Sequence, residues 1–253
     1  MSTVVLQTHA LVKRFGGITA TSAVSLSVMR GARHALIGPN GAGKTTLINL
    51  LTGVLPATSG SVELNGRDIT TMAPHRRVGL GLVRTFQINQ LFASLTPLQS
   101  LALAVASRVD SARNWWRPMG ADPTIAAESK HLLQQFRLED HADQATRELP
   151  YGKRRLLEIA LAVALKPRVL LLDEPAAGVP AAERADILAT VAALPEEVSV
   201  VLIEHDMDLV FSFATRITVL VNGTVLTEGT PGEIAADPQV QAVYLGDGEV
   251  AHG

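Results

Sequence analysis

The feature that most constrains this chain is a glycine-rich segment, GPNGAGKTT, at residues 38–46. It matches the pattern G-x-x-x-x-G-K-[S/T] and lies between an apolar run and a segment with helical spacing, which is the context of a P-loop. In such a loop, backbone N–H groups and the positive end of the following helix point at phosphate oxygens. A chance glycine-rich turn before a helix is the alternative. The expected phosphate-binding residues are Gly38, Pro39, Asn40, Gly41, Ala42, Gly43, Lys44, Thr45 and Thr46.

Two side chains of this loop carry the charge and metal chemistry of the expected site. Lys44 places an ammonium at the β- and γ-phosphates, and Thr45 supplies a hydroxyl to the Mg²⁺ that bridges them. The net charge of −2 and the isoelectric point near 6.4 give no general field that would gather nucleic acid or anionic lipid. Any phosphate must therefore be bound locally, and no nucleic-acid partner is expected.

The mean hydropathy of +0.23 requires that a membrane span be considered. The most apolar stretch, residues 156–165, contains Glu158 and is far shorter than the ~20 residues of a spanning helix. The first residues lack the basic and apolar regions of a signal peptide. The 253-residue chain has no cysteine, which is compatible with a reducing compartment. We therefore expect an unprocessed cytoplasmic chain.

Strand and helix patterns alternate along the chain and predict an α/β fold with βαβ crossovers. Gly53 is well placed as the C-terminal stop of a helix over residues 44–51, and Asn65-Gly66 and Asn222-Gly223 predict tight turns. A helical subdomain starts at Thr96-Pro97, an N-cap followed by a first-turn proline. Further helices are predicted at 98–105, 126–136, 151–165 and 231–244, and strands at 4–11, 24–28, 35–37, 62–64, 82–86, 169–172, 199–203 and 217–221.

Two adjacent carboxylates, Asp173 and Glu174, end the apolar strand predicted at residues 169–172. They would lie at the carboxyl edge of a parallel sheet, where ligands bind in such folds. One carboxylate can hold Mg²⁺ and the other can orient water. A solvated strand end is the alternative for the pair alone, but the P-loop in the same chain favours the functional interpretation.

The order of these motifs resembles the ATP-binding subunit of an ABC transporter over essentially the whole chain. GPNGAGKT corresponds to the Walker A motif of that family and VLLLDEP to its Walker B motif. The resemblance implies that Asp173 supports Mg²⁺ and that Glu174 is the general base for the attacking water. It also implies a P-loop NTPase fold of the ABC type, with a β-rich antiparallel subdomain and a helical subdomain, and ATP as the nucleotide.

Three further residues match positions of the family. Gln87, in RTFQ, corresponds to the Q-loop glutamine, which senses Mg²⁺ and water and touches the transmembrane partner. His205, in IEHD, corresponds to the switch histidine that contacts the γ-phosphate, and Phe15, in KRFGG, to the aromatic residue that stacks on adenine. Taken singly, each residue has an ordinary structural explanation, as a polar strand end, an exposed histidine or a core aromatic.

The signature motif of the family, usually LSGGQ, reads LPYGK here. Pro150 has neither a hydroxyl nor a backbone N–H, so it cannot make the serine contact to phosphate. The amides of Tyr151 and Gly152 remain available to the nucleotide of the opposite subunit, and Lys153 falls near a helix N-terminus, where a nearby anion would relieve the opposed charges. A solvated basic face is the alternative for Lys153.

LPYG with RRLLEIA, IEHDM and the tail EGTPGEIAADPQVQAVYLG resemble the ATPases of branched-chain amino acid importers. The resemblance implies a motor subunit with three kinds of partner: a second ATPase subunit, transmembrane permease subunits and, indirectly, a substrate-binding protein. Such a subunit lies on the inner face of the cell membrane. A urea or amide importer, a lipopolysaccharide exporter, a non-transport ABC ATPase and a degenerate nucleotide sensor are the alternatives. One ABC domain is expected, with a core at residues 1–95 and 156–253 and a helical subdomain at 96–155.

Overall fold

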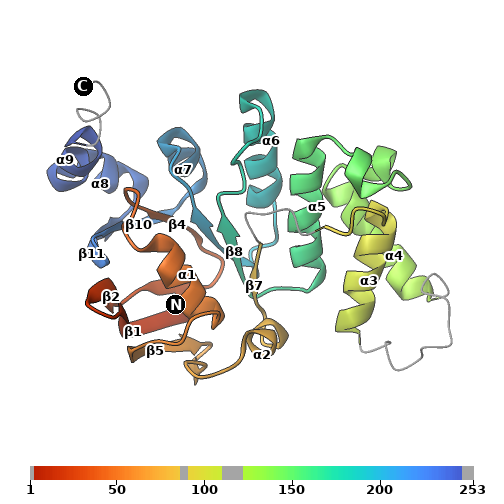
Figure 1. The fold of residues 1–253 in the computed structure, drawn as a ribbon. Helices are drawn as coiled ribbons and strands as arrows, with labels where there is room; N and C mark the ends of the chain where they lie inside the picture. The colour runs from red at the N-terminus through yellow and green to blue at the C-terminus, as the bar shows by residue number, and fades with distance from the viewer. Residues whose placement is uncertain (1–2, 86–90, 110–121, 247–253) are drawn as a thin grey trace. The chain divides into compact units, whose positions relative to one another are not determined.

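The computed structural model describes residues 3–85, 91–109 and 122–246, and the chain divides into two compact units. Unit 1 contains Met1–Arg84, Arg168–Glu174 and Pro195–Gly253, and unit 2 contains Thr85–Pro167 and Pro175–Leu194. Figure 1 shows the helices and strands of each. Residue 155, at which the expected helical subdomain ends, lies within helix α5 (Tyr151–Ala164).

Unit 1 contains a six-stranded sheet in the order β11-β10-β4-β9-β8-β7. The five strands from β10 to β7 pair in parallel, and β11 is antiparallel to β10. Because both faces of such a sheet are covered, its central strands read as continuous apolar runs, as predicted. The strands are β4 (Arg33–Ile37), β7 (Leu82–Arg84), β8 (Val169–Asp173), β9 (Ser199–Ile203), β10 (Arg216–Val221) and β11 (Thr224–Gly229).

A second sheet of unit 1 is antiparallel and has five strands, in agreement with the expected β-rich subdomain. Its strands are β1 (Val4–Phe15), β2 (Ile18–Val24), β3 (Ser27–Met29), β5 (Ser59–Leu64) and β6 (Arg67–Asp68). The prediction of a single strand at 24–28 was wrong, because β2 and β3 flank a break there that follows the left-handed Ala23 (φ 50°). β1 is longer than expected, since Phe15 pairs with Ile18 across a tight turn.

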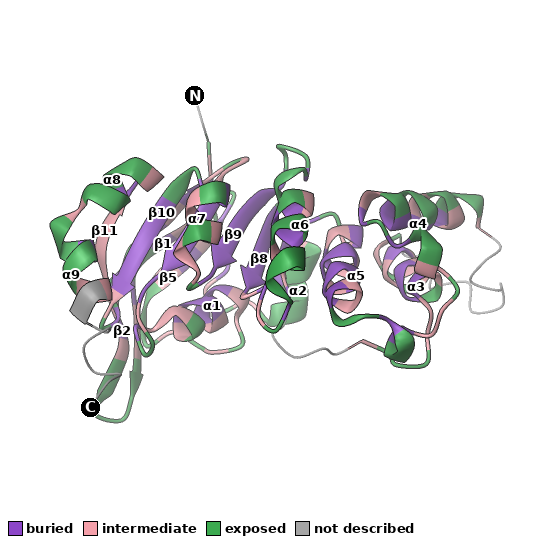
Figure 2. Cartoon of the chain, turned by 90° about the horizontal axis from the view of Figure 1, so that it is seen from above, coloured by how far each residue is buried: buried purple, intermediate pink, exposed green. Residues whose placement is uncertain are grey.

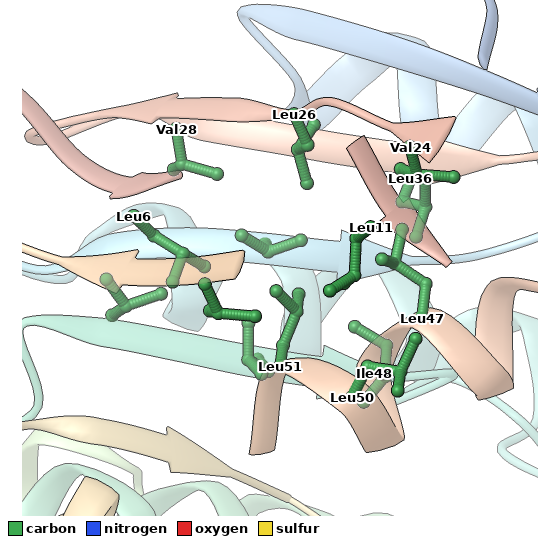
Figure 3. Close-up of a cluster of buried hydrophobic side chains, with 14 of the residues drawn as sticks. Leu6, Leu11, Val24, Leu26, Val28, Leu36, Leu47, Ile48, Leu50 and Leu51 are labelled. Atoms are coloured by element: carbon green, nitrogen blue, oxygen red, sulfur yellow. The ribbon is translucent and has the colours of Figure 1, made fainter. Parts of the chain in front are cut away.

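Helix α1 (Lys44–Thr52) packs in a hydrophobic core with strands of both sheets. The core explains the apolar spacing of its sequence, since four of its nine residues are buried. Figure 3 shows these side chains beside those of β1 and β4. The labelled members of the cluster are Leu6, Leu11, Val24, Leu26, Val28, Leu36, Leu47, Ile48, Leu50 and Leu51.

The C-terminal end of α1 is closed by Gly53 and Arg77. Gly53 adopts the left-handed conformation (φ 77°), which confirms the predicted glycine stop. Arg77, from helix α2 (Pro74–Gly79), is 2 % exposed and donates to the carbonyls of Leu50 (2.8 Å) and Leu51 (2.6 Å). Its other hydrogen bonds run to the carbonyls of Met72 (2.9 Å) and Thr70 (2.8 Å). The buried cation thus supplies a donor to the last-turn carbonyl of Leu51 and a second donor to that of Leu50, which also accepts from the Gly53 N–H (3.2 Å).

Three more helices belong to unit 1: α7 (Met207–Phe213), α8 (Pro231–Ala236) and α9 (Pro238–Gly246). The single helix expected at 231–244 is therefore two, separated at Asp237 and restarted at Pro238, whose ring cannot continue the preceding helix. Figure 2 shows β8, β9 and β10 buried along most of their length, whereas α8 is largely exposed.

Unit 2 is helical in the part that the structure describes. It contains α3 (Pro97–Arg108), α4 (Pro123–Gln135), α5 (Tyr151–Ala164) and α6 (Ala181–Ala192), with short 3₁₀ turns η2 (Glu139–His141) and η3 (Thr146–Glu148). The predicted N-cap at Thr96 is confirmed, and Gln99 completes a capping box with it. Among the helices of residues 3–85, 91–109 and 122–246, none has the length and apolar character needed to cross a bilayer.

Candidate functional site

The P-loop connects β4 to α1, as the sequence predicts, and its glycines are required by close backbone approaches. A Cβ atom on Gly38 (φ 153°) would overlap the carbonyl oxygen of Leu220, and one on Gly43 (φ 99°) would overlap that of Ala20. Both φ values also lie in the region that disfavours other residues. The loop therefore passes directly beside β10 and β2, with its amides at the N-terminus of α1.

Lys44 is the first residue of α1 and reaches back over the loop. Its ammonium donates to the carbonyl oxygens of Gly38 (2.6 Å) and Pro39 (3.0 Å). Burial lowers the pKa of Lys44 below its usual value, while the nearby carboxylates of Glu174 and Asp173 oppose that shift. The ammonium is held by acceptors that phosphate oxygens could replace.

A pocket of about 430 Å³ lies in front of the P-loop, within unit 1. Two groups of its lining residues were not predicted: the start of β2 and the turn between β10 and β11. This turn was predicted as a turn from its Asn-Gly dipeptide, but nothing local in the sequence indicates that it meets the P-loop. The lining residues are Ile18, Thr19, Ala20, Asn40, Gly41, Ala42, Gly43, Lys44, Thr45, Thr46, Glu174, Asn222 and Gly223.

Backbone hydrogen bonds tie this turn to the loop. The Gly223 N–H donates to the Ala42 carbonyl (2.9 Å), and the Ser22 N–H donates to the Gly223 carbonyl (2.7 Å). A side chain on Gly223 would approach the Ala20 carbonyl oxygen to 2.7 Å. The turn between β10 and β11 therefore holds the P-loop through a hydrogen bond, and β2 holds that turn in the same way.

The two carboxylates lie at the end of β8, as predicted. Asp173 is 2 % exposed, and Glu174 follows it with φ 48°, an uncommon conformation for a residue with a side chain. The Glu174 N–H donates to the Ile203 carbonyl of β9 (2.9 Å), which holds this turn. Glu174 lines the pocket together with Lys44 and Thr45, so the structure brings the two predicted motifs to one cavity.

Arg84, at the end of β7, is a residue of this site that sequence reasoning missed. Its Nη2 donates to Asp173 Oδ2 (2.6 Å) and its Nη1 donates to Asn49 Oδ1 of α1 (2.6 Å). It is the first residue of RTFQ, the segment in which Gln87 was singled out, but a lone arginine after two apolar residues indicates nothing about its partner.

Five predicted residues of unit 1 are not among those that line the pocket: Phe15, Gly38, Pro39, Asp173 and His205. Phe15 is 47 % exposed beside the β1–β2 turn, and the Lys13 ammonium lies 5.1 Å from its ring centroid. The side chain of His205 is 68 % exposed, with Nδ1 3.9 Å from Glu204 Oε2. Gln87 lies outside the residues that the structure describes.

The LPYGK segment begins helix α5 in unit 2. The Tyr151 hydroxyl donates to the Ala177 carbonyl (3.1 Å), and the Lys153 ammonium donates to the Arg137 carbonyl (2.8 Å). Gly152 is buried, and a Cβ there would overlap Glu183 Oε2 of α6. The exposed Glu183 side chain thus places its carboxylate at the positive end of α5, in the space that a side chain at position 152 would need.

Comparison with known protein families gives two matches. Residues 21–177 match the model of the ABC transporter family, and residues 224–250 match that of the branched-chain amino acid ATP-binding cassette transporter. The second match covers the tail whose sequence resembled these importers.

Several curated proteins are similar over nearly the whole chain. The branched-chain amino acid transport ATP-binding protein BraF of Pseudomonas aeruginosa is 38 % identical over 98 % of this chain and 100 % of its own. LivG of Escherichia coli K12, which carries the same description, is 36 % identical over the same shares of the two chains.

Solved structures agree with the fold. The ADP conformation of MJ1267, an ATP-binding cassette of an ABC transporter, superposes with a TM-score of 0.85 at 31 % identity and covers 97 % of this chain and 100 % of its own. A nucleotide-free ATP-binding cassette gives a TM-score of 0.82 at 31 % identity, over 96 % of this chain and 99 % of its own. The chain therefore belongs to the family of ABC transporter ATP-binding proteins and is an ATPase of the P-loop type.

Proposed function

We propose that this ATPase is the motor subunit of an importer for branched-chain or other amino acids. The observation that carries the proposal is the pocket in which the P-loop, Lys44 and Glu174 meet, in a chain whose relatives over its full length are named for branched-chain amino acid transport. The match of the C-terminal segment to the branched-chain cassette model supports the choice of substrate class.

In the proposed site, the amides of residues 38–46 and the Lys44 ammonium bind the phosphates of ATP. The Thr45 hydroxyl and the Asp173 carboxylate are hard oxygen donors at the loop and at the end of β8, a donor set that fits Mg²⁺. The ion, when bound, supplies charge neutralisation for the phosphates. Glu174 acts as general base, accepting a proton from the attacking water at its carboxylate.

Gln87, His205 and Phe15 complete the proposed nucleotide site. His205 contacts the γ-phosphate, and Gln87 contacts Mg²⁺ or the attacking water. Phe15 stacks on adenine from the β1–β2 turn, which is next to the pocket residues Ile18–Ala20. The exposure of His205 and Phe15 supports these roles, because neither side chain has to leave a packed core to reach a ligand.

The signature segment has its role in a pair of ATPase subunits. Tyr151, Gly152 and Lys153 contact the nucleotide bound by the second subunit. The Lys153 ammonium then donates to a phosphate oxygen instead of the Arg137 carbonyl. Hydrolysis changes the relative stability of the open and closed pair, and this difference drives the permease. The helical subdomain, proposed at residues 96–155, contacts the permease at the inner face of the membrane, and the substrate-binding protein acts through that permease.

The proposal is tested by co-expressing the chain with candidate permease subunits and reconstituting the purified complex in vesicles. ATPase activity is then measured with binding protein loaded with leucine, isoleucine or valine, with urea or short amides, or with no ligand. Stimulation by the amino-acid-loaded protein is expected. Stimulation by urea or amides alone would assign a different cargo, and failure to bind any permease would overturn the transport function itself.

A further inference from the structure

We infer that Arg84 is a positioning residue for the proposed metal-supporting carboxylate, Asp173, and that Asn49 sets the orientation of Arg84. The inference rests on the proposed function, in which Asp173 supports Mg²⁺. None of the roles above requires this arginine, and it lies in β7, outside the P-loop and the strand that carries Asp173.

The sheet register explains why Arg84 reaches Asp173. In the parallel pair of β7 and β8, Arg84 is aligned with Leu171, two residues before Asp173. Side chains two residues apart on a strand share a face, so Arg84 and Asp173 are diagonal neighbours on one face of the sheet. The guanidinium spans this diagonal, and its Nη2 meets Asp173 Oδ2 at 2.6 Å.

Burial makes this contact important for the carboxylate. The side chain of Asp173 is 2 % exposed and that of Arg84 is 11 % exposed. A carboxylate withdrawn from water to this extent needs hydrogen-bond donors that hold it in one orientation. Because Arg84 engages Oδ2, the other oxygen, Oδ1, is the one that can serve a metal.

Asn49 fixes the direction of the guanidinium. Its Oδ1 accepts from Arg84 Nη1 at 2.6 Å, and the planar guanidinium holds Nη1 and Nη2 in a fixed fork. Asn49 lies in α1, the helix that begins with Lys44. The chain Asn49–Arg84–Asp173 therefore links the phosphate-binding helix to the carboxylate of β8.

The direction in which the half-saturating Mg²⁺ concentration changes distinguishes a positioning role of Arg84 from an effect of its charge alone. A cation beside a metal ligand opposes metal binding electrostatically, so if Arg84 acted only through its charge, removing it would lower the Mg²⁺ concentration needed for half-saturation. If Arg84 positions Asp173, its removal raises that concentration. Groups that orient metal-supporting carboxylates typically contribute about 10- to 100-fold to metal affinity.

The test measures the affinity of adenylyl imidodiphosphate, a non-hydrolysable ATP analogue, by calorimetry across a Mg²⁺ titration. For Arg84→Gln we expect the half-saturating Mg²⁺ concentration to rise about 10-fold or more. Arg84→Lys keeps the charge but cannot span both partners, so it should shift in the same direction. Asn49→Ala leaves the Arg84–Asp173 pair intact and should give a smaller rise, which keeps the inference testable if the Arg84 variants fail to fold.

Arg108→Gln is the matched control, because it breaks an arginine–carboxylate pair of the same length, to Glu128 (2.6 Å), within unit 2. It should leave the Mg²⁺ dependence unchanged. An unchanged or lowered half-saturating Mg²⁺ concentration in Arg84→Gln, or in Asn49→Ala where the arginine variants do not fold, would overturn the inference. Asp173→Asn tests the proposed role of Asp173 separately. If this variant also leaves the Mg²⁺ dependence unchanged, the role of Asp173 in supporting Mg²⁺ is wrong, rather than the role of Arg84 in positioning Asp173.

Discussion

Replacing His34 with glutamine should reduce the loss of stability that acid causes in this protein. His34 lies in β4, has no exposed surface, and its Nε2 is 2.8 Å from Thr218 Oγ1. The Thr218 hydroxyl donates to Glu228 Oε2 (2.8 Å), so Nε2 must be the protonated nitrogen that donates to Thr218. Among the described residues, Nδ1 has no hydrogen-bond partner. A second proton there would bury a charge on an unsatisfied donor.

The environment of His34 sets the size of the stability loss on acidification. Burial lowers the pKa of His34 from its ordinary 6.5 to about 4; Glu228 opposes the shift and Arg216 reinforces it. The unfolded chain therefore binds more protons than the folded protein between these two values, and stability falls as the pH drops through that window. At about pH 5 the loss due to His34 is about 2 kcal/mol relative to pH 7.5, and above the unfolded value the contribution is constant.

The assay is urea unfolding of the wild type and of His34→Gln at about pH 7.5 and about pH 5. Glutamine keeps an amide donor for Thr218 and has no charge to gain, while the other titrating groups are shared by both proteins. The wild type should lose about 2 kcal/mol more than the variant on acidification. Equal losses in the two proteins would refute the assignment of His34 as a buried neutral imidazole.

Two further predictions concern packing. Arg77→Met should lower the free energy of unfolding by about 3–5 kcal/mol, because it removes the buried hydrogen bonds that Arg77 donates to four backbone carbonyls. Arg76→Met, on the exposed face of the same helix, should change the free energy of unfolding by no more than about 0.5 kcal/mol in urea titrations. Equal changes in the two variants would contradict the role of Arg77 as a buried donor at the end of α1. Gly152→Ala should force the exposed Glu183 side chain away from the start of α5, so the two positions should be coupled by about 0.5 kcal/mol or more in a double-mutant cycle with Glu183→Ala. A cycle with no coupling would show that the two groups do not compete for space.

Local sequence signals predicted the elements whose causes are themselves local. Gly53 ends α1, Thr96 begins α3, and Asn65-Gly66 and Asn222-Gly223 adopt left-handed turn conformations, because capping and turn chemistry depend on neighbours within a few residues. The P-loop was predicted for the same reason, since its glycine spacing and its flanking strand and helix are contiguous.

The parts that could not be predicted depend on long-range pairing. Nothing near Arg84 indicates that it will meet Asp173, because the contact requires the β7–β8 register and 89 residues separate the two. The entry of Asn222 into the pocket likewise depends on β10 pairing beside β4. The residues of the site could thus be predicted where they lie close together in the sequence, but not where strand pairing brings distant residues together.

The most direct test of the account compares Glu174→Gln with the wild type in ATP binding and in ATP turnover. If Glu174 is the general base in the pocket formed with the P-loop, the variant should bind Mg-ATP with about wild-type affinity, while turnover falls by about 100-fold or more. Glu139→Gln, at an exposed carboxylate of unit 2, should leave both quantities unchanged. Hydrolysis at the wild-type rate in Glu174→Gln would contradict the account.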